Sequence, residues 1–249
     1  MKAVIDDTVI LAGGMASPDL QALTGVKFRA EVPWGTGTML DPVVNALAAV
    51  SPPEGPLIIG GPPREGRWVP SGETLAQTLR LALEHVQGDR FLVSTCDLPF
   101  LTPESIAYLV EHLDPACDIT YPMVPMELCR ARFPGVPRTR LRLREGEFTG
   151  GNVFAFRTES LRTALAHFEA VYAARKSPVR LGAIVGWGTA LRIVAAKLTP
   201  GLVSARRLAA DVTARFGIPV QALVVPFAEI GTDVDDAAQY RSLLGLQQS

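Results

Sequence analysis

The stretch Thr8-Val9-Ile10-Leu11-Ala12-Gly13-Gly14-Met15-Ala16-Ser17 decides the expected fold, because a β-branched and aliphatic run passes directly into two glycines. Such a run predicts a buried first strand that ends in a turn where the backbone can approach a ligand closely. Amides exposed in such a turn suit phosphate oxygens, particularly if a helix starts just after it. Many first strands end in Gly-Gly simply to turn, so this stretch alone does not separate the two interpretations.

Alternating strands and helices follow in the first half of the chain. Apolar runs predict strands at Pro56–Gly61 and Phe91–Thr95, and helical spacing of apolar residues predicts helices at Met39–Val50, Leu75–Val86 and Pro103–His112. This order implies right-handed crossovers and a mostly parallel sheet. Ligands in such sheets bind beyond the carboxyl ends of the strands, which is where the glycine turn lies.

Connecting segments are also predicted. Ser17–Val32 is expected to be an irregular loop, and Arg67–Val69 a short strand. Ser71 is a candidate N-cap for the helix that begins at Leu75, and Thr102 can cap the helix that begins at Pro103.

The second half continues without a linker-like stretch, so we expect one α/β domain over residues 1–249 with a helical insertion at about 157–216. The segment Arg138–Arg144 alternates arginine with other residues, and period two places four arginines on one face of a strand. Strands are also predicted at Asp118–Pro122 and Val220–Pro226, and the segment Phe148–Phe156 leads into a further strand. The predicted helices are Glu159–Arg175, one or two within Val179–Lys197, Ser204–Phe216 with Gly217 as its stop, and one from Ala237.

Composition excludes several classes of protein. The 249 residues are 48% hydrophobic and carry a net charge of -1, which argues against a nucleic-acid-coating surface. Three cysteines show no metal-binding spacing and suit a reducing cytoplasm. The longest apolar stretch, Leu181–Leu198, is interrupted by glycines and charges and is not expected to span a membrane. We therefore expect a cytoplasmic protein with no nucleic-acid or membrane partner, and a homodimer is compatible with the sequence.

Carboxylates at two places are candidates for a divalent metal site. Asp97 follows a predicted strand, and Asp233 and Asp235 lie in a late acidic loop. Hard cations such as Mg²⁺ take carboxylate and phosphate oxygens, and they need only one or two protein carboxylates. The alternative interpretation is that each aspartate caps a helix or a turn.

In order of elements, VILAGG (9–14), STCDLPFLTPE (94–104) and DVDD (233–236) resemble the MobA-like NTP transferase family. The resemblance implies a three-layer α/β/α Rossmann-like fold of the GT-A type, with a mostly parallel sheet. It also implies a nucleotidyltransferase that moves a nucleoside monophosphate from an NTP to a phosphorylated or similar small-molecule acceptor, with release of pyrophosphate.

The resemblance assigns roles by position. The nucleotide would be contacted by Leu11, Ala12, Gly13, Gly14, Ser71, Gly72 and Thr74. Asp97 would bind Mg²⁺, and Asp235 or Asp233 would complete the metal site. The partners are then a nucleotide and a small-molecule acceptor.

One departure from the family concerns the loop after LAGG, where members usually carry an Arg, Met-Gly and a Lys. This chain has Met15-Ala16-Ser17-Pro18-Asp19 there, without an arginine. Arg29 occupies the place of the Lys, with Lys27 a near alternative, and these two are the catalytic candidates besides Asp97. Arg carries the same charge as Lys, but its planar guanidinium makes hydrogen bonds in a different geometry from the Lys ammonium.

The arginine segment is the candidate acceptor site. Arg138, Arg140, Arg142 and Arg144 could hold a phosphate or carboxylate through paired hydrogen bonds, with Thr149, Gly150, Gly151 and Asn152 beside them. The alternative interpretation is a solvated edge strand whose cations discourage aggregation.

Other functions are weighed against this one. A nucleotide-binding module that has lost catalysis and acts as a sensor or partner is the main alternative, since the loop after LAGG has fewer cations. A Rossmann dehydrogenase and a Walker-type NTPase lack their glycine motifs, because neither G-x-G-x-x-G nor G-K-S/T is present after the first strand.

Overall fold

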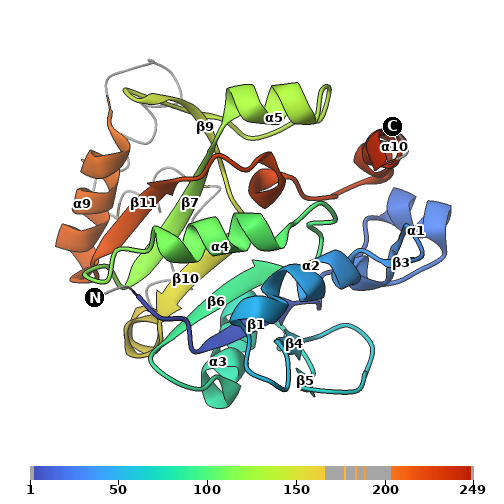
Figure 1. Cartoon of the computed structure of the whole chain (residues 1–249), viewed down its shortest axis with the longest axis horizontal. Helices are drawn as coiled ribbons and strands as arrows, with labels where there is room; N and C mark the ends of the chain where they lie inside the picture. Colours follow the sequence, from blue (N-terminus) through green and yellow to red (C-terminus); the bar gives the residue numbers. More distant parts are fainter. Residues whose placement is uncertain (1–2, 166–176, 178–182, 184–187, 189–202, 248–249) are drawn as a thin grey trace.

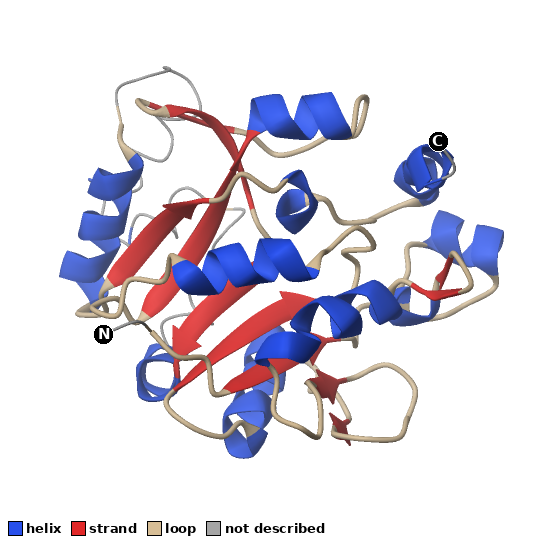
Figure 2. Cartoon of the chain, viewed as in Figure 1, coloured by secondary structure: helices blue, strands red, loops and turns tan. Residues whose placement is uncertain are grey.

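The protein is described by a computed structural model that covers residues 3–165, 177, 183, 188 and 203–247. A nine-stranded sheet runs through the described part of the molecule, and helices lie on both of its faces (Figure 1, Figure 2). Its main path has the order β5-β4-β1-β6-β10-β7-β9-β8, and β11 pairs with the free side of β7.

One half of the sheet is parallel, as the sequence predicts. Its strands are β1 (Asp7–Leu11), β4 (Leu57–Ile59), β5 (Trp68–Val69) and β6 (Arg90–Thr95). In register, Val9 lies opposite Val93 on one side and Leu57 on the other. The carboxyl ends of β1, β4 and β6 therefore meet at one edge.

The other half of the sheet is mixed. β10 (Val153–Arg157) is antiparallel to both β6 and β7 (Ile119–Pro125), and β11 (Val220–Val224) is parallel to β7. β8 (Leu141–Leu143) and β9 (Gly146–Gly150) form a hairpin that pairs with β7. Because β10 runs the opposite way, its first residue lies at the same edge as the last residues of β1 and β6.

Alternating side chains of the central strands supply two separate cores. Ile10 and Leu92 face α2 (Leu40–Leu47) and α4 (Pro103–Glu111), whereas Val9 and Phe91 face the other side. That second side is covered by α3 (Leu75–His85) and the helical residues 158–165. The three-layer α/β/α Rossmann-like architecture is thereby confirmed.

The remaining elements lie around this frame. At the C-terminal side are α9 (Ala205–Phe216), which ends at the left-handed Gly217, and α10 (Ala237–Gln247), both as predicted. A short 3₁₀ helix, η3 (Ala228–Gly231), follows β11. The others are α1 (Pro18–Thr24), η1 (Arg29–Glu31), β2 (Pro33–Trp34), β3 (Gly37–Thr38), η2 (Ala48–Val50) and α5 (Met126–Arg132).

Three local predictions are wrong. Residues 17–32 are not an irregular loop, because they contain α1 and η1; α1 has a proline in its first turn and ends at the left-handed Gly25. The N-cap of α3 is Thr74 and not Ser71, since the Thr74 hydroxyl accepts a hydrogen bond from the amide of Gln77. The arginine segment is a strand only over Leu141–Leu143. The segment Phe148–Phe156 does lead into a further strand, β10, and its first residues belong to β9.

The helical insertion expected at about 157–216 falls largely on residues outside the described part. Its described portions are helical at 158–165 and in α9. The predicted helices within Val179–Lys197 lie outside the described residues. Within the described residues, no helix combines the length and apolar character needed to cross a bilayer.

A buried ion pair at the amino end of β1 is expected to stabilise the fold. The fully buried Asp7 accepts two hydrogen bonds of 2.7 Å from Arg67 and one of 2.9 Å from the Gln87 amide. Asp7→Ala leaves the Arg67 guanidinium without its counter-ion and the Gln87 backbone amide without its partner, so the free energy of unfolding should fall by about 3–5 kcal/mol in urea denaturation. Glu65→Ala, at an exposed loop position, is the control and should change it by less than about 0.5 kcal/mol. A loss for Asp7→Ala as small as that of the control would contradict the prediction.

Candidate active site

Three carboxylates meet at the edge where the central strands end. Asp97 follows β6, while Asp233 and Asp235 belong to the loop between η3 and α10, and one oxygen of each lies within 4.8 Å of the others. The amide of Val234 donates to the backbone oxygen of Asp97 (3.1 Å), which fixes the two loops together. The structure thus brings together all three predicted metal ligands.

Arg29 lies against this cluster. Its Nη1 is 2.7 Å from Asp97 Oδ2 and 2.8 Å from Asp235 Oδ1. The backbone of Arg29 donates to Gly14 O (2.9 Å), and its Nε donates to Met15 O (3.3 Å). Burial lowers the pKa of Arg29, but the neighbouring Asp97 and Asp235 outweigh it and raise that pKa overall. Lys27 is exposed, and its ammonium lies over the Phe28 ring, so Arg29 is the cation at this place.

The cluster fits a divalent cation. Carboxylate oxygens are the hard ligands that Mg²⁺ prefers. Asp97 is 5% exposed, and its Oδ1 is buried without a hydrogen-bond partner among the described residues. A buried carboxylate oxygen is normally paired, and a bound cation would satisfy it.

A glycine-lined pocket lies on one side of the cluster. Gly13 and Gly60 pack back to back: a Cβ on Gly60 would lie 2.4 Å from the Gly13 Cα, and a Cβ on Gly13 would lie 2.7 Å from the Ser71 Oγ. Gly60 also has a φ of +90°, which favours glycine. The Gly13 and Gly14 amides donate to no other described residue, so they are free to contact a ligand.

This cavity of about 320 Å³, the Gly13 pocket, contains most of the predicted nucleotide-binding residues: Leu11, Gly13, Gly14, Ser71, Gly72 and Thr74, together with Arg29 and Asp97. Ala12 does not line it, because its side chain is fully buried in the core. Sequence reasoning missed the other lining residues, Glu73, Leu75, Thr78, Thr95 and Cys96. Thr95 and Cys96 directly precede Asp97, and this position was the available signal.

A second cavity of about 560 Å³, the Arg138 pocket, lies on the other side of the cluster. Asp233 and Asp235 line it, as do the predicted acceptor residues Arg138, Thr149, Gly150, Gly151 and Asn152. Sequence reasoning missed Tyr121, Pro137, Thr139, Phe154, Gly231 and Gln239. Asp97 lines the Gly13 pocket and Asp233 and Asp235 line the Arg138 pocket, so the carboxylate cluster contributes to both.

Only one of the four predicted arginines lines this pocket. Arg138 donates from Nη1 to Gly231 O, and its guanidinium lies 5.7 Å from the centre of the Phe133 ring. Arg140 and Arg142 instead pair with Glu147 of the β8–β9 hairpin, at 3.7 and 3.1 Å. Arg144 is exposed on the turn. The expectation of four guanidinium groups on one face is wrong because the strand spans only Leu141–Leu143.

Glu229 of η3 is a site-supporting residue that sequence reasoning missed. Its side chain is 1% exposed and accepts hydrogen bonds from Thr102 Oγ1 (3.3 Å) and Arg132 Nη1 (2.8 Å). It thereby ties the loop after Asp97 to the segment before Asp233. No local pattern marks Glu229, because its partners are distant in the sequence.

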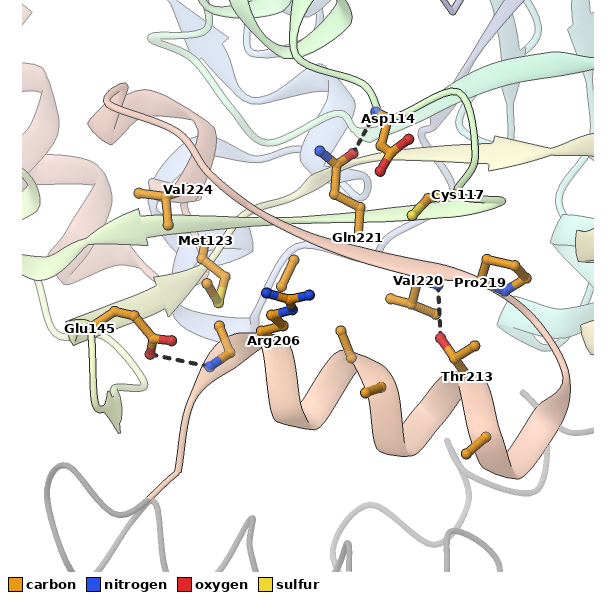
Figure 3. A pocket seen from close by; sticks show the side chains of 15 residues that line it. Asp114, Cys117, Met123, Glu145, Arg206, Thr213, Pro219, Val220, Gln221 and Val224 are labelled. Atoms are coloured by element: carbon orange, nitrogen blue, oxygen red, sulfur yellow. Dashed lines mark hydrogen bonds between the residues drawn. The ribbon is translucent and has the colours of Figure 1, made fainter.

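A third cavity, of about 740 Å³, lies between α9 and strands β7 and β11 (Figure 3). Figure 3 shows three polar contacts around it: Glu145 to the Ala205 amide, Thr213 to the Val220 amide, and Gln221 to the Asp114 amide. None of the predicted site residues lines it.

We expect the stability of the folded protein to depend on pH, because the carboxylate cluster includes a partly buried aspartate with a raised pKa. Burial, with Asp97 and Asp235 nearby, raises the pKa of Asp233 from 3.8 to about 6. The folded protein then binds this proton more tightly than the unfolded chain, so stability is lost as pH rises from about 4 to about 6. Asp233→Asn keeps the shape without the charge. In EDTA we expect it to be more stable than wild type by roughly 1–2 kcal/mol at pH 7.5, and by little at pH 4.

Urea denaturation at both pH values measures this difference. Glu65→Gln, at an exposed loop position, is the control, and it should differ from wild type by less than about 0.5 kcal/mol at both pH values. A stabilisation by Asp233→Asn that stays constant or shrinks as pH rises would contradict the prediction.

Known proteins resemble this chain in sequence and in fold. The model of the MobA-like NTP transferase domain matches residues 8–177. A solved structure entitled a hypothetical transferase from Thermus thermophilus is 34% identical, with a TM-score of 0.82, and the alignment covers 96% of this chain and 99% of that chain. No curated protein matches the chain.

Two more distant solved structures share the fold. A CMP:2-keto-3-deoxy-manno-octonic acid synthetase complexed with CTP is 15% identical, with a TM-score of 0.61 and coverage of 100% and 99%. The 2-C-methyl-D-erythritol 4-phosphate cytidylyltransferase from Thermus thermophilus is 18% identical, with a TM-score of 0.55 and coverage of 99% and 100%. With the family model matching over most of the chain, the protein belongs to the MobA-like NTP transferase family.

Proposed function

We propose that the protein transfers a nucleoside monophosphate from an NTP to a phosphorylated or similar small-molecule acceptor, with release of pyrophosphate. The observation that carries this proposal is the arrangement of two separate pockets on either side of one carboxylate cluster. Group transfer needs a donor and an acceptor held at one reacting centre, and this arrangement suits two substrates.

The Gly13 pocket suits the nucleotide. The Gly13 and Gly14 amides are available to phosphate oxygens, and Arg29 adds a positive charge at the same wall. The rest of the lining, which includes Ser71, Gly72 and Thr74, is uncharged except for Glu73 and Asp97 and would accommodate the nucleoside.

The Arg138 pocket suits the acceptor. Arg138 provides a cation for an anionic group, and the side chains of Thr149 and Asn152 provide hydrogen-bonding groups. An acceptor oxygen held here would attack the α-phosphorus. The bond from that oxygen to phosphorus forms as the bond to the bridging oxygen breaks, and pyrophosphate leaves with the electron pair.

Asp97, Asp233 and Asp235 would hold Mg²⁺ between the pockets. The ion would supply neutralisation of phosphate charge. Arg29 contributes a further positive charge in a partly dry site, where such groups act more strongly than in water. The described part of the site has no feature that favours the alternative, a nucleotide-binding module without catalysis.

Loss of Asp97 tests the reaction. Asp97→Asn removes one charge of the cluster with little change of shape. We expect pyrophosphate release, measured with each of the four NTPs, Mg²⁺ and a panel of phosphorylated acceptors, to fall about 100-fold or more. Exposed Glu104→Gln is the control and should keep wild-type turnover. Nucleotide binding without turnover for every acceptor would instead support the non-catalytic module.

The close packing of Gly13 against Ser71 gives an independent test of the nucleotide pocket. A Cβ at position 13 would lie 2.7 Å from Ser71 Oγ and 2.8 Å from Ser71 Cβ. Gly13→Ala should therefore displace Ser71 and weaken nucleotide binding about tenfold or more by calorimetry. The double variant Gly13→Ala/Ser71→Gly removes the clash and should regain part of the affinity. An unchanged affinity for Gly13→Ala would place the nucleotide elsewhere.

A further inference from the structure

Arg29 is bonded to two of the three side chains that would hold a divalent cation. A single nitrogen, Nη1, lies 2.7 Å from Asp97 Oδ2 and 2.8 Å from Asp235 Oδ1. The three aspartates carry a formal charge of −3 when ionised, and among the described residues Arg29 is the cation paired with Asp97 and Asp235. The guanidinium thus already compensates part of the charge that would attract a metal ion.

The backbone around Arg29 keeps it at this place. The Met15–Phe28 bridge and the hydrogen bonds from the Ala16 amide to Lys27 O (3.0 Å) and from the Arg29 amide to Gly14 O (2.9 Å) pair residues 27–29 with residues 14–16. The start of the side chain is therefore fixed, while its guanidinium lies between the cluster and the Gly13 pocket, which Arg29 also lines. The same guanidinium therefore contacts the carboxylates and lines the pocket in which an anionic ligand would bind.

We propose that Arg29 is the internal counter-ion of Asp97 and Asp235 in the free protein, and that it competes with a divalent cation for these carboxylates. The cation binds well only after an anionic ligand of the Gly13 pocket draws Arg29 away. The proposal rests on the proposed function, because it takes the cluster as the cation site and the Gly13 pocket as the triphosphate site.

Two consequences follow from competition for the same carboxylates. The free protein binds a divalent cation weakly, because the cation's bonds to Asp97 Oδ2 and Asp235 Oδ1 must replace or share those made by the Arg29 guanidinium. A polyanion in the Gly13 pocket and a cation at the cluster assist each other, since each favours the conformation in which Arg29 has left the aspartates. Arg29 is thus a positioning residue for the cation as well as a cation for the phosphates.

Binding of Mn²⁺ to the full chain without nucleotide tests the proposal. We expect Arg29→Gln to bind Mn²⁺ about tenfold or more tightly than wild type, by calorimetry or by electron paramagnetic resonance of free Mn²⁺. Arg29→Lys keeps the charge but has no planar guanidinium, and it should fall between the two. Lys27→Gln removes an exposed charge two residues away and is the matched control, with an affinity within about twofold of wild type.

Thermal unfolding provides a second readout. Without Arg29 the three carboxylates repel one another more strongly, so Arg29→Gln should unfold at a lower temperature than wild type in EDTA. Addition of Mn²⁺ should raise the unfolding temperature of this variant more than that of wild type. Equal Mn²⁺ affinities for wild type and Arg29→Gln would overturn this proposal and leave the proposed function intact. Absence of Mn²⁺ binding in every variant, with or without an NTP, would overturn both.

Discussion

Mutual repulsion among Asp97, Asp233 and Asp235 is the constraint on which the site depends. Their carboxylates lie within 4.8 Å of one another, and Asp97 is almost fully buried. Such a group of charges is stable only if it is compensated, and Arg29 provides part of that compensation. The raised pKa of Asp233 has the same cause, because burial and the two neighbouring aspartates both disfavour its charged form.

The surrounding structure holds these like charges together through contacts of η3. Glu229 binds Thr102 and Arg132, the backbone oxygen of Ile230 accepts from the Asn152 amide, and Gly231 accepts from Arg138. One short turn of helix therefore connects the loop after β6, helix α5, the start of β10 and the Arg138 pocket. A late segment of the chain is in this way fixed to an early one, and the carboxylates that line the two pockets are brought together.

Much of the frame could be predicted from local patterns. The run Thr8–Gly14 gave a strand and a tight turn, and Thr102 with Pro103 gave a helix start, because neighbouring residues alone decide these features. Short elements could not be predicted in this way. α1 buries only Leu20, so its apolar period was too brief to detect. The arginine alternation at 138–144 was misleading, because Glu147 across the hairpin, and not a common ligand, accounts for Arg140 and Arg142.

The sequence by itself determined the order of strands and helices, the glycine turn after β1, and the residue types that a phosphate and cation site needs. These features depend on side-chain period, glycine and proline geometry, and chemical type, all of which are local. Only the tertiary structure decided that Arg29 rather than Lys27 meets the carboxylates, that Arg138 alone of four arginines enters a pocket, and that Glu229 ties the two loops together. The physical reason is that the Arg29 and Glu229 contacts join residues 68 and 127 positions apart in the sequence, and the packing of the sheet and its loops decides which residues meet at such separations. The fate of the four arginines depends on where strand β8 ends, which is also decided by its pairing in the sheet.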